Sequence, residues 1–253
     1  NIPIRTELGR ELRRFFLPEK EDYVIIDADY SQIELRLLAH VSGDENMIRA
    51  FREGVDVHTS TAATVFGVPE EEVTSEMRKR AKAVNFGIMY GIGAFSLSDD
   101  IGVSVAEAQG FSNRYLAGYP RIDAYLKGVI EQAYRDGFVT TLFGRRRYIP
   151  ELSSQKGNLR AFGKRVAMNA PIQGTAADII KLAMIRVYEA LKANYPEANL
   201  LLQVHDELIV EVSKKDADAA AVILKNEMEH AVETRVPLTV DVATGKNWYE
   251  AKQ

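Results

Sequence analysis

The sequence of 253 residues contains no cysteine, which excludes disulfides and thiolate metal sites and fits a reducing compartment. It also lacks an apolar run long enough to span a bilayer, and no signal-peptide pattern opens it. An excess of positive charge is absent too, because the net charge is −4. Net charge alone does not exclude a nucleic-acid partner, since the distribution of charge decides binding.

The composition, with 46% hydrophobic and 27% charged residues, is that of a soluble globular protein. Hydrophobic periodicity predicts an α+β fold, in which both ends of the sequence form a small sheet and a largely helical insertion separates them. The expected strands are 23–28, 200–204, 208–212 and 238–242, with a short hairpin at 138–149. The expected helices are 7–16, 32–41, 44–51, 58–66, 75–90, 104–116, 120–136, two stretches separated by Pro171, and 215–233.

The segment 200–212 predicts a β-hairpin with a polar turn. Two apolar runs flank His205-Asp206-Glu207, so we expect both arms to be buried and the turn to carry the three ionisable residues. Adjacent carboxylates between buried strands are costly unless a cation lies against them.

A second acidic site lies far upstream, where the apolar strand 23–28 leads into Asp27 and Asp29. If Asp29 and Asp206 converge, their oxygens form a site suited to Mg²⁺, which prefers carboxylates and a substrate phosphate as ligands.

A third pattern is the stripe Arg78, Lys82, Phe86 and Tyr90, whose members lie four residues apart on one expected helix. Two cations near the helix amino terminus favour phosphate binding, and an aromatic beyond them can stack on a base. A solvated charged face that runs into core aromatics is the alternative interpretation of the stripe alone. Together with the acidic pair, the stripe indicates nucleotidyl transfer.

Three segments carry a resemblance to a known family: Asp29-Tyr-Ser-Gln-Ile-Glu-Leu-Arg36, the stripe followed by Gly91, and Gln203-Val-His-Asp-Glu207. In type and order they resemble the signature motifs of the family A DNA polymerases, the DNA polymerase I type, and the resemblance covers the whole chain. It implies a right-hand polymerase fold with palm at 1–43, fingers at 44–160 (helix 75–90) and palm again at 161–253 (hairpin 198–212), without a thumb. The segment Ile92–Ser98 departs from the family pattern.

The resemblance implies the two-metal mechanism. Asp29, Asp206 and the backbone carbonyl of Tyr30 would bind two Mg²⁺ ions, for which Mn²⁺ can substitute, and Glu207 would lie beside them. Lys82 would protonate the departing pyrophosphate.

The resemblance also implies a dNTP site. Arg78 and Lys82 would hold the phosphates, Phe86 would stack on the incoming base, and Tyr90 would occupy the template-base position until the helix closes. Glu34 would exclude a 2′-hydroxyl. The full implied set is Gln32, Glu34, His58, Arg78, Lys82, Phe86 and Tyr90, although His58 taken alone is more typical of a helix-surface or core histidine.

The implied partner is primer-template DNA. Arg165, Asn169, Gln173 and His205 match residues that test pair geometry in the minor groove. Arg160 is expected either to contact DNA phosphates or to be a solvated surface residue.

The resemblance further implies that the thumb and exonuclease-like domains of a parent polymerase lie outside this sequence, so the chain alone is expected to bind DNA weakly. No membrane partner is expected. The expected location is cytoplasmic and nucleoid-associated, in a bacterial or phage-infected cell. Three alternatives stay open: a single-subunit RNA polymerase, against which Glu34 argues; a non-catalytic DNA-binding module; and a two-metal nuclease.

Overall fold

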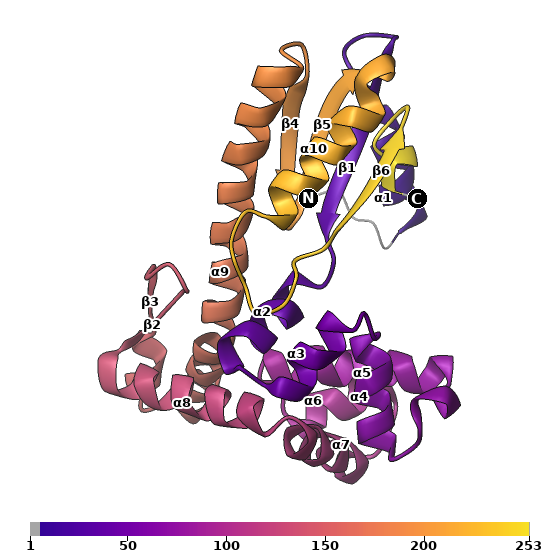
Figure 1. Ribbon diagram of the computed structural model, residues 1–253. Coiled ribbons are helices and arrows are strands. Elements are labelled where there is room, and N and C mark those ends of the chain that lie inside the picture. Colours follow the sequence, from indigo (N-terminus) through magenta and orange to yellow (C-terminus); the bar gives the residue numbers. More distant parts are fainter. Residues whose placement is uncertain (1–5, 253) are drawn as a thin grey trace. The chain divides into compact units, whose positions relative to one another are not determined.

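The computed structural model describes residues 6–252, which divide into two compact units (Figure 1). Unit 1 comprises 6–33, 176–233 and 238–252, and unit 2 comprises 34–175 and 234–237. The sheet and the acidic residues belong to unit 1, and the helical insertion belongs to unit 2. The functional division into palm and fingers at 43 and 160 stays a prediction.

Unit 1 is built on a four-stranded antiparallel sheet with the order β4-β5-β1-β6. The strands are β1 (Tyr23–Tyr30), β4 (Asn199–Val204), β5 (Glu207–Ser213) and β6 (Val240–Gly245). The two central strands, β1 and β5, are buried along almost their whole length, which fits the apolar majority of their residues. They hold the acidic residues in the buried centre of the sheet.

Besides the short 3₁₀ turns η1 (Arg13–Phe15) and η4 (Lys214–Asp216), three helices and a carboxyl-terminal turn complete the described part of unit 1. They are α1 (Glu7–Leu12), the part of α9 (Gly157–Asn194) from Ala176 onward, α10 (Ala217–Glu229) and the 3₁₀ turn η5 (Glu250–Lys252). Helix α10 packs across β1, β5 and β6 (Figure 1). Turn η5 packs on β6 and β1, where Trp248 and Ala251 form a small core with Ile25 and Ile209.

Unit 2 is mostly helical. Its elements are α2 (Ile33–Ser42, in this unit from Glu34), α3 (Glu45–Arg52), α4 (Val57–Phe66), α5 (Ser75–Met89), α6 (Ala94–Ile101), α7 (Val105–Gly118), α8 (Pro120–Asp136), the hairpin β2 (Phe138–Thr140) and β3 (Arg146–Tyr148), and the first part of α9. Helices α4 and α5 pack side by side and α7 packs against both, so α5 is held by two neighbours.

Short polar side chains set where these helices begin. Asp44, Asp56, Thr74 and Ser104 each accept a hydrogen bond from a backbone N–H in the first turn of the helix that follows. This satisfies amide groups that have no partner inside the helix. The expected starts of α3, α5 and α7 are confirmed, and Asp56 fixes the start of α4.

The sequence analysis missed helix α6, and several other local predictions are wrong. Helix α9 is not divided at Pro171 but passes through it as one element. Proline removes one intrahelical hydrogen bond at a cost of about 3 kcal/mol, which the burial of Ala167 and Ile172 beside it offsets. The arm β4 is not buried either, because it is the edge strand of the sheet, and Leu201 and Leu202 are each 40% exposed.

Along residues 6–252, no helix combines the length and apolar character that crossing a bilayer requires.

Two buried tyrosines of unit 2 provide a matched stability test. The hydroxyl of Tyr115 is fully buried without a hydrogen-bond partner, whereas the hydroxyl of Tyr119 lies 3.4 Å from the Thr61 hydroxyl. We expect Tyr115→Phe to raise the free energy of unfolding by about 1 kcal/mol, because it removes an unsatisfied polar group. Tyr119→Phe should lower it by about 0.5–1 kcal/mol. Chemical denaturation measures both, and a destabilised Tyr115→Phe variant would contradict the burial argument.

Candidate active site

The pairing of β1 with β5 places the two distant acids of the sequence side by side. Asp29 lies opposite Glu207 in the antiparallel register, and the Tyr30 N–H donates to the Asp206 carbonyl at 3.2 Å. Burial and the neighbouring Asp29 charge raise the pKa of Asp206 to about 6. The predicted convergence of Asp29 with Asp206 is therefore present within unit 1.

The local backbone explains why Asp206 faces β1. His205 and Asp206 form a two-residue turn, and His205 has the positive φ of 54° that such tight hairpin turns require. The Gln203 side chain donates to the His205 carbonyl at 2.7 Å and stabilises the turn. Glu207, predicted in the turn, is instead the first residue of β5 and is only 6% exposed.

A lysine at the carboxyl end lies against these acids, and the sequence prediction did not include it. The Lys252 ammonium contacts the carboxylates of Asp27, Asp29 and Glu207 at 3.4 Å from Asp27 Oδ1 and 2.8 Å from Asp29 Oδ2. Asp27 is 2% exposed and also accepts a hydrogen bond from Trp248 Nε1 at 3.1 Å. Burial and the Glu207 charge raise the pKa of Asp27 to about 6.

The acidic end of the sheet fits a hard divalent cation. The charge of Asp29 acts on the Asp206 carboxyl, so the two acids are near enough to interact, and Glu207 Oε1 is buried without a hydrogen-bond partner. In residues 6–252, no cluster of three or more acidic or histidine side chains is arranged as a complete metal site. Mg²⁺ commonly binds one or two carboxylates and completes its shell with water and substrate phosphate, so the pair Asp29 and Asp206 stays the predicted ligand set.

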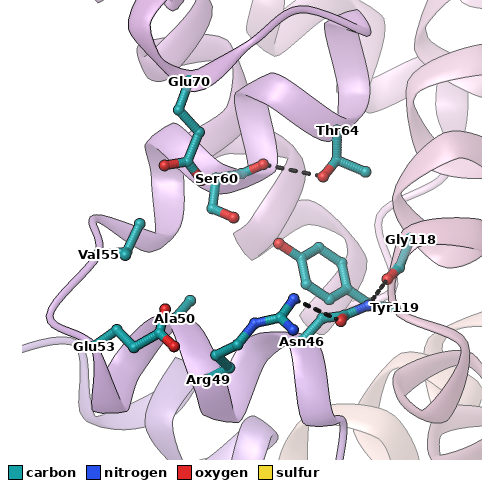
Figure 2. Close-up of a pocket in the computed structure, with 10 residues that line it drawn as sticks. All are labelled: Asn46, Arg49, Ala50, Glu53, Val55, Ser60, Thr64, Glu70, Gly118 and Tyr119. Atoms are coloured by element: carbon teal, nitrogen blue, oxygen red, sulfur yellow. Dashed lines mark hydrogen bonds between the residues drawn. The ribbon is translucent and has the colours of Figure 1, made fainter.

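A shallow cavity of about 260 Å³ opens beside this cluster, lined by Asp27, Asp29 and Lys252 together with β6 residues. The described part of the chain has a larger cavity of about 320 Å³ in unit 2 (Figure 2). It lies between α3, α4 and the start of α8, with the Tyr119 ring and the Arg49 and Glu70 side chains around it. None of the predicted site residues lines this larger cavity.

In unit 2, the stripe on α5 has the predicted helical placement. Arg78 and Lys82 are exposed, and the Phe86 and Tyr90 rings stack with centroids 6.0 Å apart. Arg78 forms two hydrogen bonds with Asp56, at 3.1 and 2.7 Å. Burial acts against ionisation of Asp56, but hydrogen bonds from Arg78 and Thr59 hold the pKa of this carboxyl at about 2. The guanidinium is thus positioned by a carboxylate that the sequence prediction did not include.

His58 is a buried residue of unit 2. Its ring is 2% exposed, lies 3.2 Å from the Asn85 amide nitrogen and contacts the Phe86 ring. Burial, with a smaller effect of nearby cations, lowers the pKa of His58 to about 4, so the ring is neutral at pH 7. This environment matches the core-histidine alternative and leaves its predicted phosphate contact untested.

Glu34 is held by the end of α5. The Tyr90 hydroxyl donates to Glu34 Oε2 at 2.6 Å, which joins the residue predicted to exclude a 2′-hydroxyl to the residue predicted to hold the template-base position. Gln32 has a positive φ of 54° just before α2, and its Oε1 is buried without a hydrogen-bond partner.

The predicted DNA-binding residues have different surroundings. Arg165, Asn169 and Gln173 follow one another at four-residue spacing along α9, where Arg165 and Gln173 are exposed and Asn169 Oδ1 is buried without a partner. Arg160 donates to the backbone carbonyls of Ser154 and Gln155 and is exposed.

Asp27, Trp248 and Asp56 contribute to the surroundings of the predicted site residues, and each could have been noticed in the sequence. Asp27 lies two positions before Asp29 and therefore on the same face of β1, and Trp248 is the single tryptophan. Asp56 follows the pattern of a helix N-cap. Lys252 had no comparable signal, because only the packing of η5 against the sheet brings it to the acids.

Comparison with known proteins gives a consistent result. The family model described as DNA polymerase family A matches residues 1–250. DNA polymerase I of Caldicellulosiruptor bescii is 52% identical over 252 residues, and DNA polymerase I of Bacillus subtilis is 53% identical over 252 residues. The matches cover 100% of this chain but 30% and 29% of those relatives, so the chain spans less than a third of their length.

A solved structure is also similar: the POL domain of Pol1 from M. smegmatis in complex with DNA primer-template and dNTP. It has a TM-score of 0.93 and 44% sequence identity, and the match covers 100% of this chain and 45% of that one. The fold class expected from the sequence is confirmed by this likeness.

The raised pKa of Asp206 gives a pH test of the cation site. Because this carboxyl is protonated below about pH 6, Mn²⁺ affinity should fall about tenfold for each pH unit below that value. Titration followed by electron paramagnetic resonance measures the affinity. Asp206→Asn should bind weakly with little pH dependence, whereas the exposed Asp218→Asn should behave as the parent.

In metal-free protein, the raised pKa of Asp206 makes folding stability change with pH in the direction opposite to metal affinity. A folded-state pKa above the unfolded value means that the folded state binds the proton more tightly, so the free energy of unfolding falls as pH rises through about 6. Asp206→Asn should reduce that fall in denaturation curves measured from pH 4 to 7, and an unchanged profile would count against a buried, perturbed Asp206.

Proposed function

The chain belongs to DNA polymerase family A, and from this premise we propose that it is the palm-and-fingers part of a DNA-directed DNA polymerase of the polymerase I type. Its activity would be template-directed transfer of a nucleotide from a dNTP to a primer 3′-hydroxyl, with release of pyrophosphate. The observation that carries this proposal is the placement of Asp29 beside Asp206 at the end of the buried strand pair β1–β5.

Asp29 and Asp206 are the proposed ligands of two divalent cations, with Mg²⁺ as the natural ion and Mn²⁺ as a substitute. Bound there, the ions would lower the pKa of the primer hydroxyl and neutralise the charge of the triphosphate. The two carboxylates hold and orient this site from a buried, paired strand region, which suits phosphoryl transfer because the reaction depends on positioning and electrostatic stabilisation. The Tyr30 carbonyl, at the end of β1, is the further proposed ligand.

The α5 stripe is the proposed nucleotide site. Arg78 and Lys82 bind the phosphates as exposed cations, and Lys82 is the proposed proton donor to pyrophosphate. Arg78 already pairs with Asp56, so the incoming phosphates would compete with a carboxylate for the same guanidinium. This exchange keeps the guanidinium pre-oriented and lowers the entropy lost when a triphosphate binds.

The base and sugar contacts are proposed at the carboxyl end of the same helix. Phe86 stacks on the incoming base, and Tyr90 lies in the template-base position until closure. The hydrogen bond from Tyr90 supports the role of Glu34, because it fixes a carboxylate in one orientation under the sugar. A fixed side chain excludes a 2′-hydroxyl more strongly than a mobile one, which would have room to move away.

The proposed partner is primer-template DNA. Exposed Arg165 and Gln173 on α9 and exposed His205 beside Asp206 are available as minor-groove contacts, and Asn169 and Arg160 complete the proposed set. The M. smegmatis relative was solved with DNA primer-template and dNTP, which supports the same substrates here. Thumb and exonuclease-like domains are proposed for the parent polypeptide, because the curated relatives are more than three times as long as this chain.

We place this activity in the bacterial cytoplasm at the nucleoid, where template and dNTPs are found. The relatives named above are bacterial, which supports this location.

Primer extension tests the function. In the intact polypeptide that carries this chain, Asp206→Ala should lower the Mg²⁺-dependent rate of matched dNTP addition by about a thousandfold or more, because it removes several kcal/mol of transition-state stabilisation. Asp218→Ala, an exposed aspartate on α10, is the matched control and should extend normally. Extension by Asp206→Ala at the parent rate would reject the proposed role of Asp206.

Sugar selection tests Glu34. Glu34→Ala should reduce the preference for dATP over ATP by about 10- to 100-fold, because space opens beneath the sugar. Tyr90→Phe keeps the carboxylate but removes the hydrogen bond at 2.6 Å, so it should relax the preference less. Single-nucleotide incorporation kinetics with both substrates give the ratio. Equal preference in Glu34→Ala and the parent would exclude the gate and reopen the RNA polymerase alternative.

A further inference from the structure

The carboxyl-terminal lysine supplies the acidic cluster with a cation of its own. Lys252 lies on η5, is the last described residue, and its ammonium contacts Asp27, Asp29 and Glu207. Its side chain is 30% exposed, while the carboxylates of Asp27 and Glu207 are 2% and 8% exposed. The Asp29 side chain is 37% exposed, so the cation is shared by three carboxylates of which two are largely desolvated. A shared cation is the compensation that buried acids of like charge require.

The lysine is fixed to this place through its neighbours. Trp248 is 3% exposed, packs with Ile25 and Ile209, and donates its indole N–H to Asp27. Turn η5 also approaches β6 closely at Gly245, where a Cβ would lie 2.4 Å from the backbone nitrogen of Ala251. A glycine at this position therefore allows η5 to pack against the sheet. The packed turn limits how far the lysine side chain can move from the acids.

Lys252 and a divalent cation need the same carboxylate. The ammonium contacts Asp29 Oδ2, and Asp29 is a proposed metal ligand. Among the described residues, Asp206 is not a hydrogen-bond partner of this lysine, so its carboxylate stays available to an incoming cation. Two positive charges a few ångströms apart repel each other strongly at a partly buried site. A cation that binds Asp29 must therefore displace the ammonium or accept its repulsion.

We propose that Lys252 is a positioning residue that acts as a built-in counter-cation, holding Asp29 and Glu207 in place before metal arrives and competing with divalent cations for Asp29. This inference rests on the proposed function of the site. The competition keeps metal affinity low in the free protein. A triphosphate adds negative charge and phosphate oxygens, which favours the divalent cation over the ammonium. Metal and nucleotide would therefore bind together.

Metal binding to variants of the intact polypeptide tests this proposal. Lys252→Gln should bind Mn²⁺ about tenfold more tightly in the absence of nucleotide, as measured by electron paramagnetic resonance, because the competing charge is gone. Its melting temperature without metal should fall, and Mn²⁺ should raise that temperature more than in the parent, because the three carboxylates then repel one another.

Two variants serve as controls. Lys252→Arg keeps a cation at the cluster and should retain weak Mn²⁺ binding. Lys215→Gln removes the same charge from an exposed residue just beyond Ser213, at the end of β5 opposite to Glu207, and should leave Mn²⁺ affinity unchanged. Affinity equal to or below that of the parent in Lys252→Gln would overturn the proposal.

A second measurement uses the unmodified protein, so it does not depend on a variant that folds. Acylation of lysines by an amine-reactive ester, followed by mass spectrometry, reports whether the Lys252 ammonium is engaged. Mg²⁺ with a dNTP should increase acylation of Lys252 several-fold and leave that of Lys215 unchanged. Unchanged acylation of Lys252 would show that the metal does not displace it and would reject the competition.

The outcomes separate this inference from the proposed function. Normal primer extension together with unchanged Mn²⁺ affinity in Lys252→Gln would reject only the role of Lys252. Tighter Mn²⁺ binding in Lys252→Gln, in a polypeptide that does not extend primers, would reject only the polymerase function.

Discussion

The antiparallel pairing of β1 with β5 is the constraint on which the rest of this structure depends. It brings Asp29 next to the turn at Asp206 although most of the chain separates them in sequence. Both strands are buried, and a shift of register by one residue would move each side chain to the opposite face of the sheet and separate the acids. The hydrophobic core and the proposed metal site therefore require the same register. The strand pairing that stabilises the fold also places the acids where the proposed reaction needs them.

Placing acids at a buried position has an electrostatic cost that the molecule offsets locally. Burial raises the pKa of Asp27 and of Asp206 to about 6, so both carboxyls resist ionisation more than exposed ones. Lys252 offsets part of this cost in unit 1, and Trp248 fixes Asp27 by a hydrogen bond. A divalent cation supplies the same compensation with twice the charge, which is why a lysine and a metal ion are natural competitors at one cluster.

Unit 2 shows the same principle on a helix. Its proposed functional side chains do not project freely but are held by neighbours: Arg78 by Asp56, and Glu34 by Tyr90. Asp56 serves twice, because it also caps α4 through Thr59 N–H. Partners of this kind reduce the number of conformations that a side chain loses on binding.

The sequence by itself determined the α+β class, the hairpin, most helix boundaries and the stripe on α5. Hydrophobic periodicity and helix capping involve residues only a few positions apart, so they can be recognised in the sequence. It also indicated the acids, because burying carboxylates at the ends of apolar strands costs free energy unless a cation compensates their charge. Tertiary structure alone decided the continuity of α9 through Pro171, the exposure of β4 and the place of Lys252. Each of these depends on what a segment packs against, and no local pattern encodes a neighbour that lies far away in the chain.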